Sequence, residues 1–366
     1  MATLCLSLHA GYACRHTGKC CQTWNVPADP PLIELAASGA LDGARDGPPF
    51  FVRADPADAA APWNIARDPR GRCVFFDRDG ARLCAVHASA GPAALPSACR
   101  HFPRIVLRDG RGTLISLSHF CPTAAALLFE PTTAITVQAG DRLRLDEPIE
   151  GLDARHAWPP LVRPGLLSDI EGYDAWERAC IGVFARTDLG WERALDVVAA
   201  ATEKTRSWKP GGDTLSAFVV RAFGSARHED GADPDAHSRV MNTLRAVAGP
   251  PVSHDLSNID RFDAHWSRLV EGGADGWDAA MRNYLAARVF GNWIAYQGRG
   301  LRSVVEWLRT CAAAVRHHVV RRTVARGWTR QDWLESFRAA DLLLLHGIDT
   351  GAFARHVRVL EGADPR

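Results

Sequence analysis

The sequence predicts a mostly α fold in which a cysteine-rich N-terminal module of loops and small β-hairpins packs on an all-α helical domain. Three observations predict it. The chain has 366 residues, a length typical of about two domains. Eight of its 10 cysteines lie within the first 121 residues, among prolines and glycines. From about residue 165, Leu, Val, Phe and Trp recur every three or four residues, the period of an amphipathic helix.

This change in composition and apolar period predicts three segments. Residues 1–130 form the cysteine-rich module, 131–163 a hairpin and linker, and 164–366 the helical domain. The apolar period predicts eight helices in the last segment, and Thr329 with Asp332 resembles a capping arrangement at the start of the eighth. The predicted helices cover residues 174–185, 191–205, 214–225, 235–247, 263–272, 277–297, 301–326 and 330–346.

Short apolar runs separated by turn signals predict hairpins in the first part of the chain. Asp79-Gly80 and Asp109-Gly110 are turn pairs between such runs, so residues 73–84 and 104–118 are predicted to form two hairpins. A third is predicted over residues 134–145. Of the remaining N-terminal sequence, residues 31–40 are expected to form a short helix and 42–62 an irregular loop.

Composition excludes several classes of protein. With 43 Lys and Arg against 42 Asp and Glu, the formal charge is +1, so nucleic acid is not an expected partner. No apolar run approaches the roughly 18–20 residues that a membrane span needs, and no membrane association is expected. Residues 1–13 lack the basic region of a secretory signal. We therefore expect a cytoplasmic protein, in which clustered cysteines serve metal binding or catalysis more often than disulfides.

Seven of the early cysteines are candidate metal ligands. Gly18 provides a turn between Cys14 and the Cys20-Cys21 pair, so these thiols can converge. The hairpin over 73–84 brings its two end cysteines together, and two more cysteines follow it, the last in a Cys-Pro pair like those that close some iron–sulfur motifs. The predicted ligands are Cys14, Cys20, Cys21, Cys73, Cys84, Cys99 and Cys121.

The number of thiols leaves the ligand set open. Seven exceed the four that one zinc ion or one [4Fe–4S] cluster requires, so three are spare or there are two sites. We expect Cys20, Cys21, Cys84 and Cys99 to bind the metal directly, and the next candidates are Cys14, Cys73 and Cys121. Histidines near these cysteines could complete a mixed site: His16, His87, His101 and His119. Buried free thiols and disulfides are the less favoured alternatives.

The other three cysteines stand apart from this group. Cys180 and Cys311 lie among apolar residues of predicted helices and are expected in the core. Cys5 is either an eighth ligand or a strand residue.

The order of these motifs resembles the bacterial cysteine-cluster family described as zinc- or iron-chelating, in its flagellin lysine-N-methylase-like branch. The likeness rests on Cys-x₅-Cys-Cys-x-x-Trp, Cys-x-Phe-Phe, Cys-Arg-x-Phe-Pro-Arg over 99–104 and Leu-Ser-x-x-Cys-Pro-x-Ala-Ala over 117–125. It covers residues 12 to about 129, with a weaker likeness from 283 to 346. One departure is the short spacing between Cys14 and Cys20, where some relatives are expected to carry a further cysteine.

The resemblance implies a metal centre, an iron–sulfur cluster of the [4Fe–4S] type or zinc, attached to a helical domain. It also implies methyl transfer from S-adenosylmethionine to lysine side chains of flagellin or another protein. The residues themselves identify no catalytic group and no S-adenosylmethionine site, since no Gly-x-Gly-x-x-Gly follows a predicted strand. A non-catalytic zinc- or iron-binding protein is the alternative.

Overall fold

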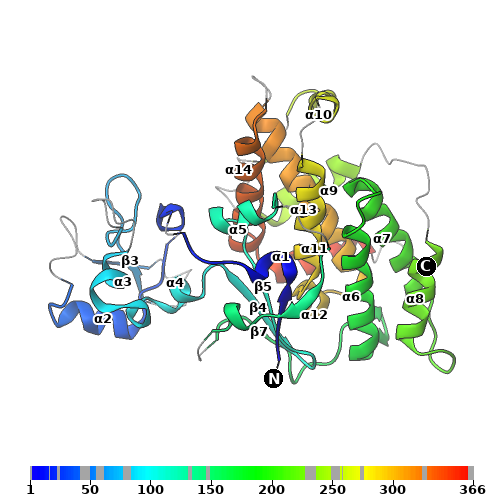
Figure 1. Cartoon of the computed structure of the whole chain (residues 1–366), viewed down its shortest axis with the longest axis horizontal. Helices are drawn as coiled ribbons and strands as arrows, with labels where there is room; N and C mark the ends of the chain where they lie inside the picture. Colours follow the sequence, from blue (N-terminus) through cyan, green and yellow to red (C-terminus); the bar gives the residue numbers. More distant parts are fainter. Residues whose placement is uncertain are drawn as a thin grey trace.

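The computed structural model shows a mostly α-helical chain with a few small sheets, as the sequence predicts (Figure 1). A small lobe that contains α2, α3 and α4 lies at one end, and α6, α7 and α8 lie at the other. The structure describes residues 2–15, 17–22, 25–41, 50–54, 62–76, 84–130, 134–145, 149–226, 236–248, 256–257, 259–272, 276–323 and 328–361.

A five-stranded sheet lies between the two ends, in the order β6-β1-β5-β4-β7. Its centre is the predicted hairpin of β4 (Arg104–Asp109) and β5 (Gly112–Leu117), which pair antiparallel around the Asp109-Gly110 turn. β1 (Thr3–Leu6) lies parallel to β5, and β7 (Leu152–Asp153) lies parallel to β4. Strands from the first 130 residues and from 131–163 therefore share one sheet.

The third predicted hairpin, over 134–145, is wrong. β6 (Val137–Ala139) pairs antiparallel with β1, and the residues after it turn into a 3-10 helix, Asp141–Leu143. The backbone N–H of Gly140 donates to the carbonyl of Thr3 at 2.9 Å, which closes this pairing. β6 therefore pairs with the edge of β1, and not with a second strand from residues 134–145 as predicted.

The small lobe has its own apolar core. It contains α2 (Pro30–Ala37), β2 (Phe51–Arg53), β3 (Trp63–Ile65), α3 (Ala85–Ala90) and α4 (Ser97–His101). Leu32, Phe75 and Val86 are buried together there. The short predicted helix is confirmed as α2, whereas β2 is a strand inside the segment that was expected to be an irregular loop. Residues 42–49 and 55–61 of that segment lie outside the described part of the chain.

The helical half follows the predicted period. Its core also takes Leu107 and Leu114 from the central hairpin, so the sheet packs directly on the helices. The helices are α6 (Ile170–Phe184), α7 (Trp191–Arg206), α8 (Leu215–Ser225), α9 (Ala236–Val247), α10 (Phe262–Glu271), α11 (Trp277–Val289), α12 (Ile294–Gln297), α13 (Leu301–Thr323), α14 (Arg330–Asp341) and α15 (Thr350–Glu361). Short elements complete the chain: α1 (Ser7–Ala10), a 3-10 helix Lys19–Gln22, a 3-10 helix Pro92–Ala94, α5 (Pro122–Leu127), β8 (Leu161–Arg163) and β9 (Leu166–Leu167).

Two predicted helices are interrupted, and one helix, α15, was not predicted. The helix expected over 277–297 breaks between α11 and α12, because Gly291 adopts a positive φ of 62° and the Asn292 side chain bonds the Arg288 carbonyl. The helix expected over 330–346 changes to a π-helical turn at Leu342–His346. Thr329 and Asp332 form the predicted capping box.

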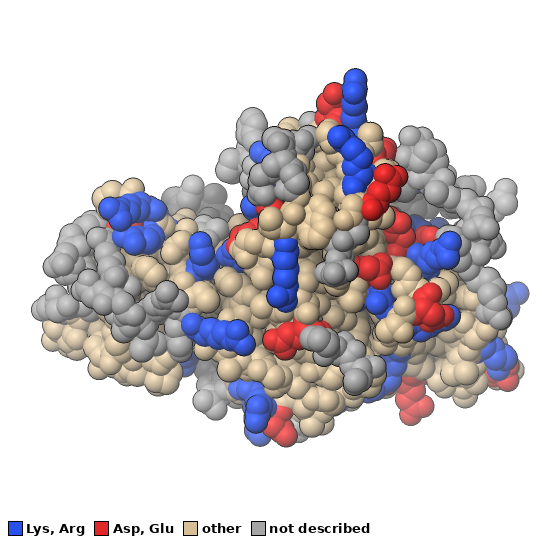
Figure 2. Space-filling view, turned by 45° about the horizontal axis from the view of Figure 1, so that its top comes forward, with Lys and Arg blue, Asp and Glu red and all other residues tan. Residues whose placement is uncertain are grey.

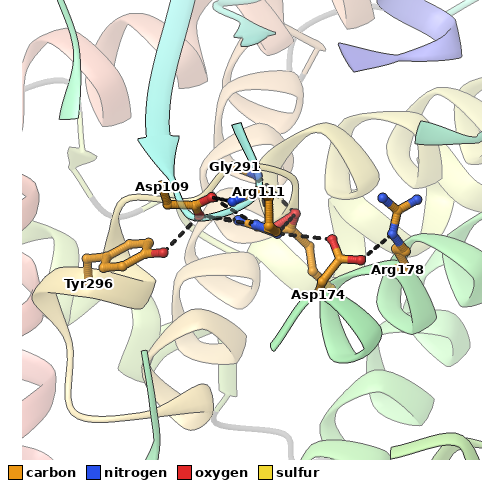
Figure 3. A network of polar contacts seen from close by, with 7 residues as sticks. Asp109, Arg111, Asp174, Arg178, Gly291 and Tyr296 are labelled. Carbon is orange, nitrogen blue, oxygen red and sulfur yellow. Dashed lines mark hydrogen bonds and ion pairs between the residues drawn. The ribbon is translucent and has the colours of Figure 1, made fainter. Parts of the chain in front are cut away.

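A buried ionic network joins the central hairpin to the helices (Figure 3). The guanidinium of Arg111 bonds both Asp109, at 2.7 Å, and Glu177 of α6, at 3.0 Å. Tyr296 of α12 donates to Asp109 at 2.8 Å, and the backbone N–H of Gly291 donates to Glu177. These residues hold the tip of the hairpin against α6 and α12.

On the face drawn in Figure 2, the described charged side chains over the helical end are not segregated by sign. Basic and acidic side chains are interspersed on the face drawn in Figure 2, in keeping with the formal charge of +1. Among the described helices, none is long and apolar enough to cross a membrane.

Candidate metal centre

One cavity of about 670 Å³ collects most of the predicted ligands. We call it the cysteine cavity. Its lining includes six of the seven predicted cysteines, which are Cys14, Cys21, Cys73, Cys84, Cys99 and Cys121. The seventh, Cys20, lies in the same 3-10 turn as Cys21, but its side chain is outside the described part of the structure. Segments more than 100 residues apart in sequence, around Cys14 and Cys121, therefore meet at one place.

A tight turn presents the first cysteines to the cavity. The backbone N–H of Cys21 donates to the carbonyl of Gly18 at 3.1 Å, and Gly18 has a φ of 67°. A Cβ at this position would lie 1.9 Å from a ring carbon of Phe76, so only glycine fits. The Cys14–Cys21 loop is thereby pressed against the segment that carries Cys73.

The next two cysteines lie at the ends of the predicted hairpin over 73–84. The backbone N–H of Cys73 donates to the carbonyl of Cys21 at 2.8 Å. Phe76 pairs with Cys84 in an isolated antiparallel bridge, and the N–H of Ala85 donates to the carbonyl of Phe75. The two arms thus come together as predicted. The turn between them, residues 77–83, lies outside the described residues.

The last two cysteines come from the beginning and the end of the central hairpin. Cys99 lies in α4, just before β4, and Cys121 precedes α5, just after β5. Tyr12 places its hydroxyl 3.6 Å from the sulfur of Cys121. Burial, followed by the neighbouring Cys121, raises the pKa of Tyr12, so the phenol keeps its proton and can donate to a thiolate.

The charges around the cysteine cavity favour thiolates. Four arginines lie on its described lining, and that lining contains no Asp or Glu. Positive charge near a thiol stabilises the ionised form, which is the form that binds metal. The four are Arg100, Arg104, Arg142 and Arg144.

Six of the predicted cysteines line the cavity, but their described side chains form no compact group of donors. Among the residues that the structure describes, no three His, Cys, Asp or Glu side chains come close enough together to hold an ion. A single tetrahedral zinc needs four donors at one point, whereas the thiolates of an iron–sulfur cluster bind separate irons. Thiolates are soft donors, which suit zinc and iron–sulfur clusters alike.

The nearby histidines divide into two groups. His87 and His101 line the cysteine cavity and remain candidates for a mixed site. His119 does not line the cavity, although it lies two residues before Cys121, because its ring points into the helical interior. His16 is outside the described residues.

His119 belongs to a fully buried polar cluster that the sequence did not predict. Its Nδ1 lies 3.2 Å from a carboxylate oxygen of Asp341, and its Nε2 lies 3.2 Å from Nε2 of His9. Tyr284 donates to the same carboxylate at 2.7 Å. Burial alone would raise the pKa of Asp341, but the Arg288 charge and the hydrogen bonds from His119 and Tyr284 lower it to about 2. No motif in the sequence connects positions 9, 119 and 341.

The remaining cysteines lie elsewhere. Cys180 and Cys311 are fully buried in the helical core, as predicted. Cys5 is a buried residue of β1, and burial, followed by Asp141, raises the pKa of its thiol to about 11. The structure thus resolves the alternative left open for Cys5 in favour of a strand residue.

Comparisons with known proteins yield no match: no family model, no curated protein and no solved structure is similar to this chain.

Proposed function

We propose that the cysteine cavity holds a thiolate-bound metal centre, and that this centre is an iron–sulfur cluster of the [4Fe–4S] type. The observation that carries the proposal is the convergence of six predicted ligands on one cavity. These cysteines come from the Cys14–Cys21 loop, the 73–84 segment and both ends of the central hairpin. Ordinary core packing does not require thiols from four separate segments to face the same cavity.

The charge of the cavity supports a thiolate-bound centre of either kind. Four thiolates on either centre leave a net negative charge, which the four arginines of the lining offset. The preference for a cluster over zinc rests on the motif resemblance over residues 12 to about 129. A zinc-loaded, non-catalytic protein is the alternative function, and it predicts colourless protein. Either centre belongs in a reducing compartment such as the cytoplasm.

We also propose methyl transfer from S-adenosylmethionine to a protein lysine, on flagellin or a similar substrate. This proposal is supported by the motif resemblance over residues 12 to about 129. Such a reaction needs a neutral amine held in line with the methyl sulfonium, so it requires a site that desolvates or deprotonates lysine. The metal centre does not depend on this activity.

Protein purified without oxygen tests the metal centre. We expect a brown sample with broad visible absorption, and iron and acid-labile sulfide in comparable amounts. Cys21→Ala and Cys84→Ala should each lose most of the iron. Cys180→Ala and Cys311→Ala are the matched controls, because both thiols lie in the helical core, and they should keep it. Full iron content in both cavity variants would contradict the proposal, and stoichiometric zinc without sulfide would favour the alternative.

The methyl transfer is tested separately. Iron-loaded protein is incubated with S-adenosylmethionine and unmodified flagellin, and the flagellin is then weighed by mass spectrometry. The expected result is added mass in methyl steps on lysine, absent when Cys21→Ala replaces the wild type. Loaded protein that adds no methyl mass and binds no S-adenosylmethionine would leave a metal protein without this activity.

A further inference from the structure

A second cavity of about 440 Å³ adjoins the cysteine cavity. We call it the hairpin cavity, because strands β4 and β5 form one wall. The end of α11, the α11–α12 connection and the π-helical turn after α14 form the others. His101, Phe102 and Arg104 line both cavities, so these three residues are a shared wall. A volume of this size is in the range of small-molecule sites.

A buried guanidinium in this lining has an unused donor. Arg288 is 4% exposed. One of its terminal nitrogens donates to the carbonyl of Leu117 at 2.6 Å, and the other lies 3.6 Å from Asp341. Its Nε has no hydrogen-bond partner among the described residues. A buried donor without a partner destabilises the fold, so an acceptor atom of a ligand would be bound favourably there.

A hydroxyl and an imidazole supply further polar contacts on the same lining. The Ser118 hydroxyl and Nε2 of His346 lie 3.1 Å apart. Ser118 is buried at the end of β5, whereas His346 is an exposed residue at the end of the π-helical turn. Together with Arg288, this pair can hold both oxygens of a bound acid.

The charges of the lining favour an anion inside the cavity. Arg104 and Arg288 are its described cations, and Glu150 is the one carboxylate among the described lining residues. Glu150 is half exposed and already engaged, since it bonds the Ser97 hydroxyl and lies 3.6 Å from His101. Of the two guanidiniums, Arg288 also lies 3.6 Å from Asp341, a carboxylate outside the lining that offsets part of its charge.

Aromatic side chains complete the lining. Phe102, Phe290, Trp293 and Trp307 contribute ring surface. The indole N–H of Trp293 donates to the carbonyl of Val106 at 3.1 Å. Its one donor is therefore engaged, and the ring contributes apolar surface to the lining. Aromatic walls with a few polar groups are typical of sites for organic ligands.

We propose that the hairpin cavity binds a small organic carboxylate with an apolar or ring-bearing body, held by Arg288, Ser118 and His346. The ring lies against the aromatic walls, and the carboxylate accepts from the Arg288 Nε–H. The site is one wall away from the cysteine cavity and stands whether or not a metal is bound there, so it goes beyond the proposed function.

Calorimetric titration of the full-length, metal-loaded protein with 3-phenylpropionate tests the site, with 3-phenylpropionamide as the uncharged probe. We expect measurable binding of the acid and at least about tenfold weaker binding of the amide, the effect of losing one charge-assisted hydrogen bond. Arg288→Gln should lower the affinity for the acid about tenfold, and Ser118→Ala should lower this affinity by a smaller factor. Metal-free protein that stays folded should bind the acid equally, which separates this result from the fate of the metal proposal.

Arg282→Gln is the matched control. Arg282 is a buried arginine of the same helix that also bonds a backbone carbonyl and an aspartate, but it does not line the hairpin cavity. The Arg282→Gln protein should bind the acid with the same affinity as the wild type. If Arg288→Gln does not fold, Ser118→Ala decides. Absence of binding by the wild type at millimolar acid, equal binding of acid and amide, or wild-type affinity in the folded cavity variants would each overturn the proposal.

Discussion

The backbone N–H of Cys73 donates to the carbonyl of Cys21 at 2.8 Å. This bond joins the turn that follows Cys14 to the first arm of the 73–84 segment, so two cysteine motifs that are distant in sequence become one structural unit. Because the bond is between backbone atoms, it does not depend on either thiol. The protein can therefore bring its thiols together before a metal binds, which lowers the entropic cost of forming the site.

Gly18→Ala is expected to damage this unit. The substitution places a Cβ 1.9 Å from a ring carbon of Phe76 and also imposes a positive φ on a residue with a side chain. We expect the iron content to fall by more than half and the thermal midpoint to drop, because Phe76 must move away from the turn. The measurements are iron per protein after anaerobic purification and the thermal unfolding curve.

Gly71→Ala is the control for that change. Gly71 has a similar φ of 73°, but no atom lies within 4 Å of a Cβ built there. This variant should lose about 1 kcal/mol of stability through the backbone alone and should keep its iron. Equal loss of iron in the two variants would show that backbone strain, and not contact with Phe76, controls the site.

Cys5→Ala and Cys121→Ala should behave differently. The Cys5 thiol is buried in β1, where its raised pKa keeps it protonated, and it faces the carbonyl of Ala139. Its loss should cost about 1 kcal/mol of stability and no iron. Cys121 lines the cysteine cavity beside the Tyr12 hydroxyl, and its loss should reduce the iron content. Iron lost from Cys5→Ala alone would show that Cys5 is a ligand after all.

Arg111→Met is expected to destabilise the fold strongly. Arg111 bonds Asp109 and Glu177, whose side chains are almost fully buried, so its removal leaves two buried carboxylates without their cation. Breaking a buried ion pair in this way costs about 3–5 kcal/mol. The measurement is the shift of the urea midpoint. Adding Glu177→Gln to Arg111→Met should recover part of the loss, and a double variant less stable than the single one would contradict this assignment.

Local signals in the sequence predicted the elements that depend on local chemistry. The Asp109-Gly110 turn placed the central hairpin, and the Thr329–Asp332 pair placed the start of α14. The pairing of β6 with β1 could not be predicted in this way, because the hydrogen bond from Gly140 to Thr3 depends on a partner far away in sequence.

The candidate site shows the same division. The cysteine motifs identified the thiols that line the cysteine cavity, because residue type and turn signals are local. The neighbours of Arg288 were not visible, since Leu117 and Asp341 reach it only through the packing of α11 against the hairpin and α14. The same holds for His119, which the sequence grouped with the cysteines and which the fold directs toward His9 and Asp341 instead.

The buried carboxylate of Asp341 should make stability depend on pH in the acid range. Its pKa is about 2 in the folded protein, below the ordinary value of 3.8. The folded state therefore binds this proton less readily than the unfolded state. The resulting stabilisation, about 2 kcal/mol, is fully present above about pH 4 and is lost as the pH falls through 2. Arg288, His119 and Tyr284 face the carboxylate and cause the lowering.

Asp341→Asn removes this dependence. The amide cannot ionise, so the variant should be less stable than the wild type at pH 6, and the gap between them should close as the pH falls from about 4 to 2. Urea midpoints of both proteins, measured on metal-free samples at intervals between pH 2 and 6, give the two curves. Burial lowers the pKa values of His9 and His119 and the Asp341 carboxylate opposes this lowering, so both imidazoles stay neutral over more of the acid range in the variant. A gap that stays constant across the acid range would mean that Asp341 titrates alike in the folded and unfolded chains, and that its contacts stabilise the fold by packing alone.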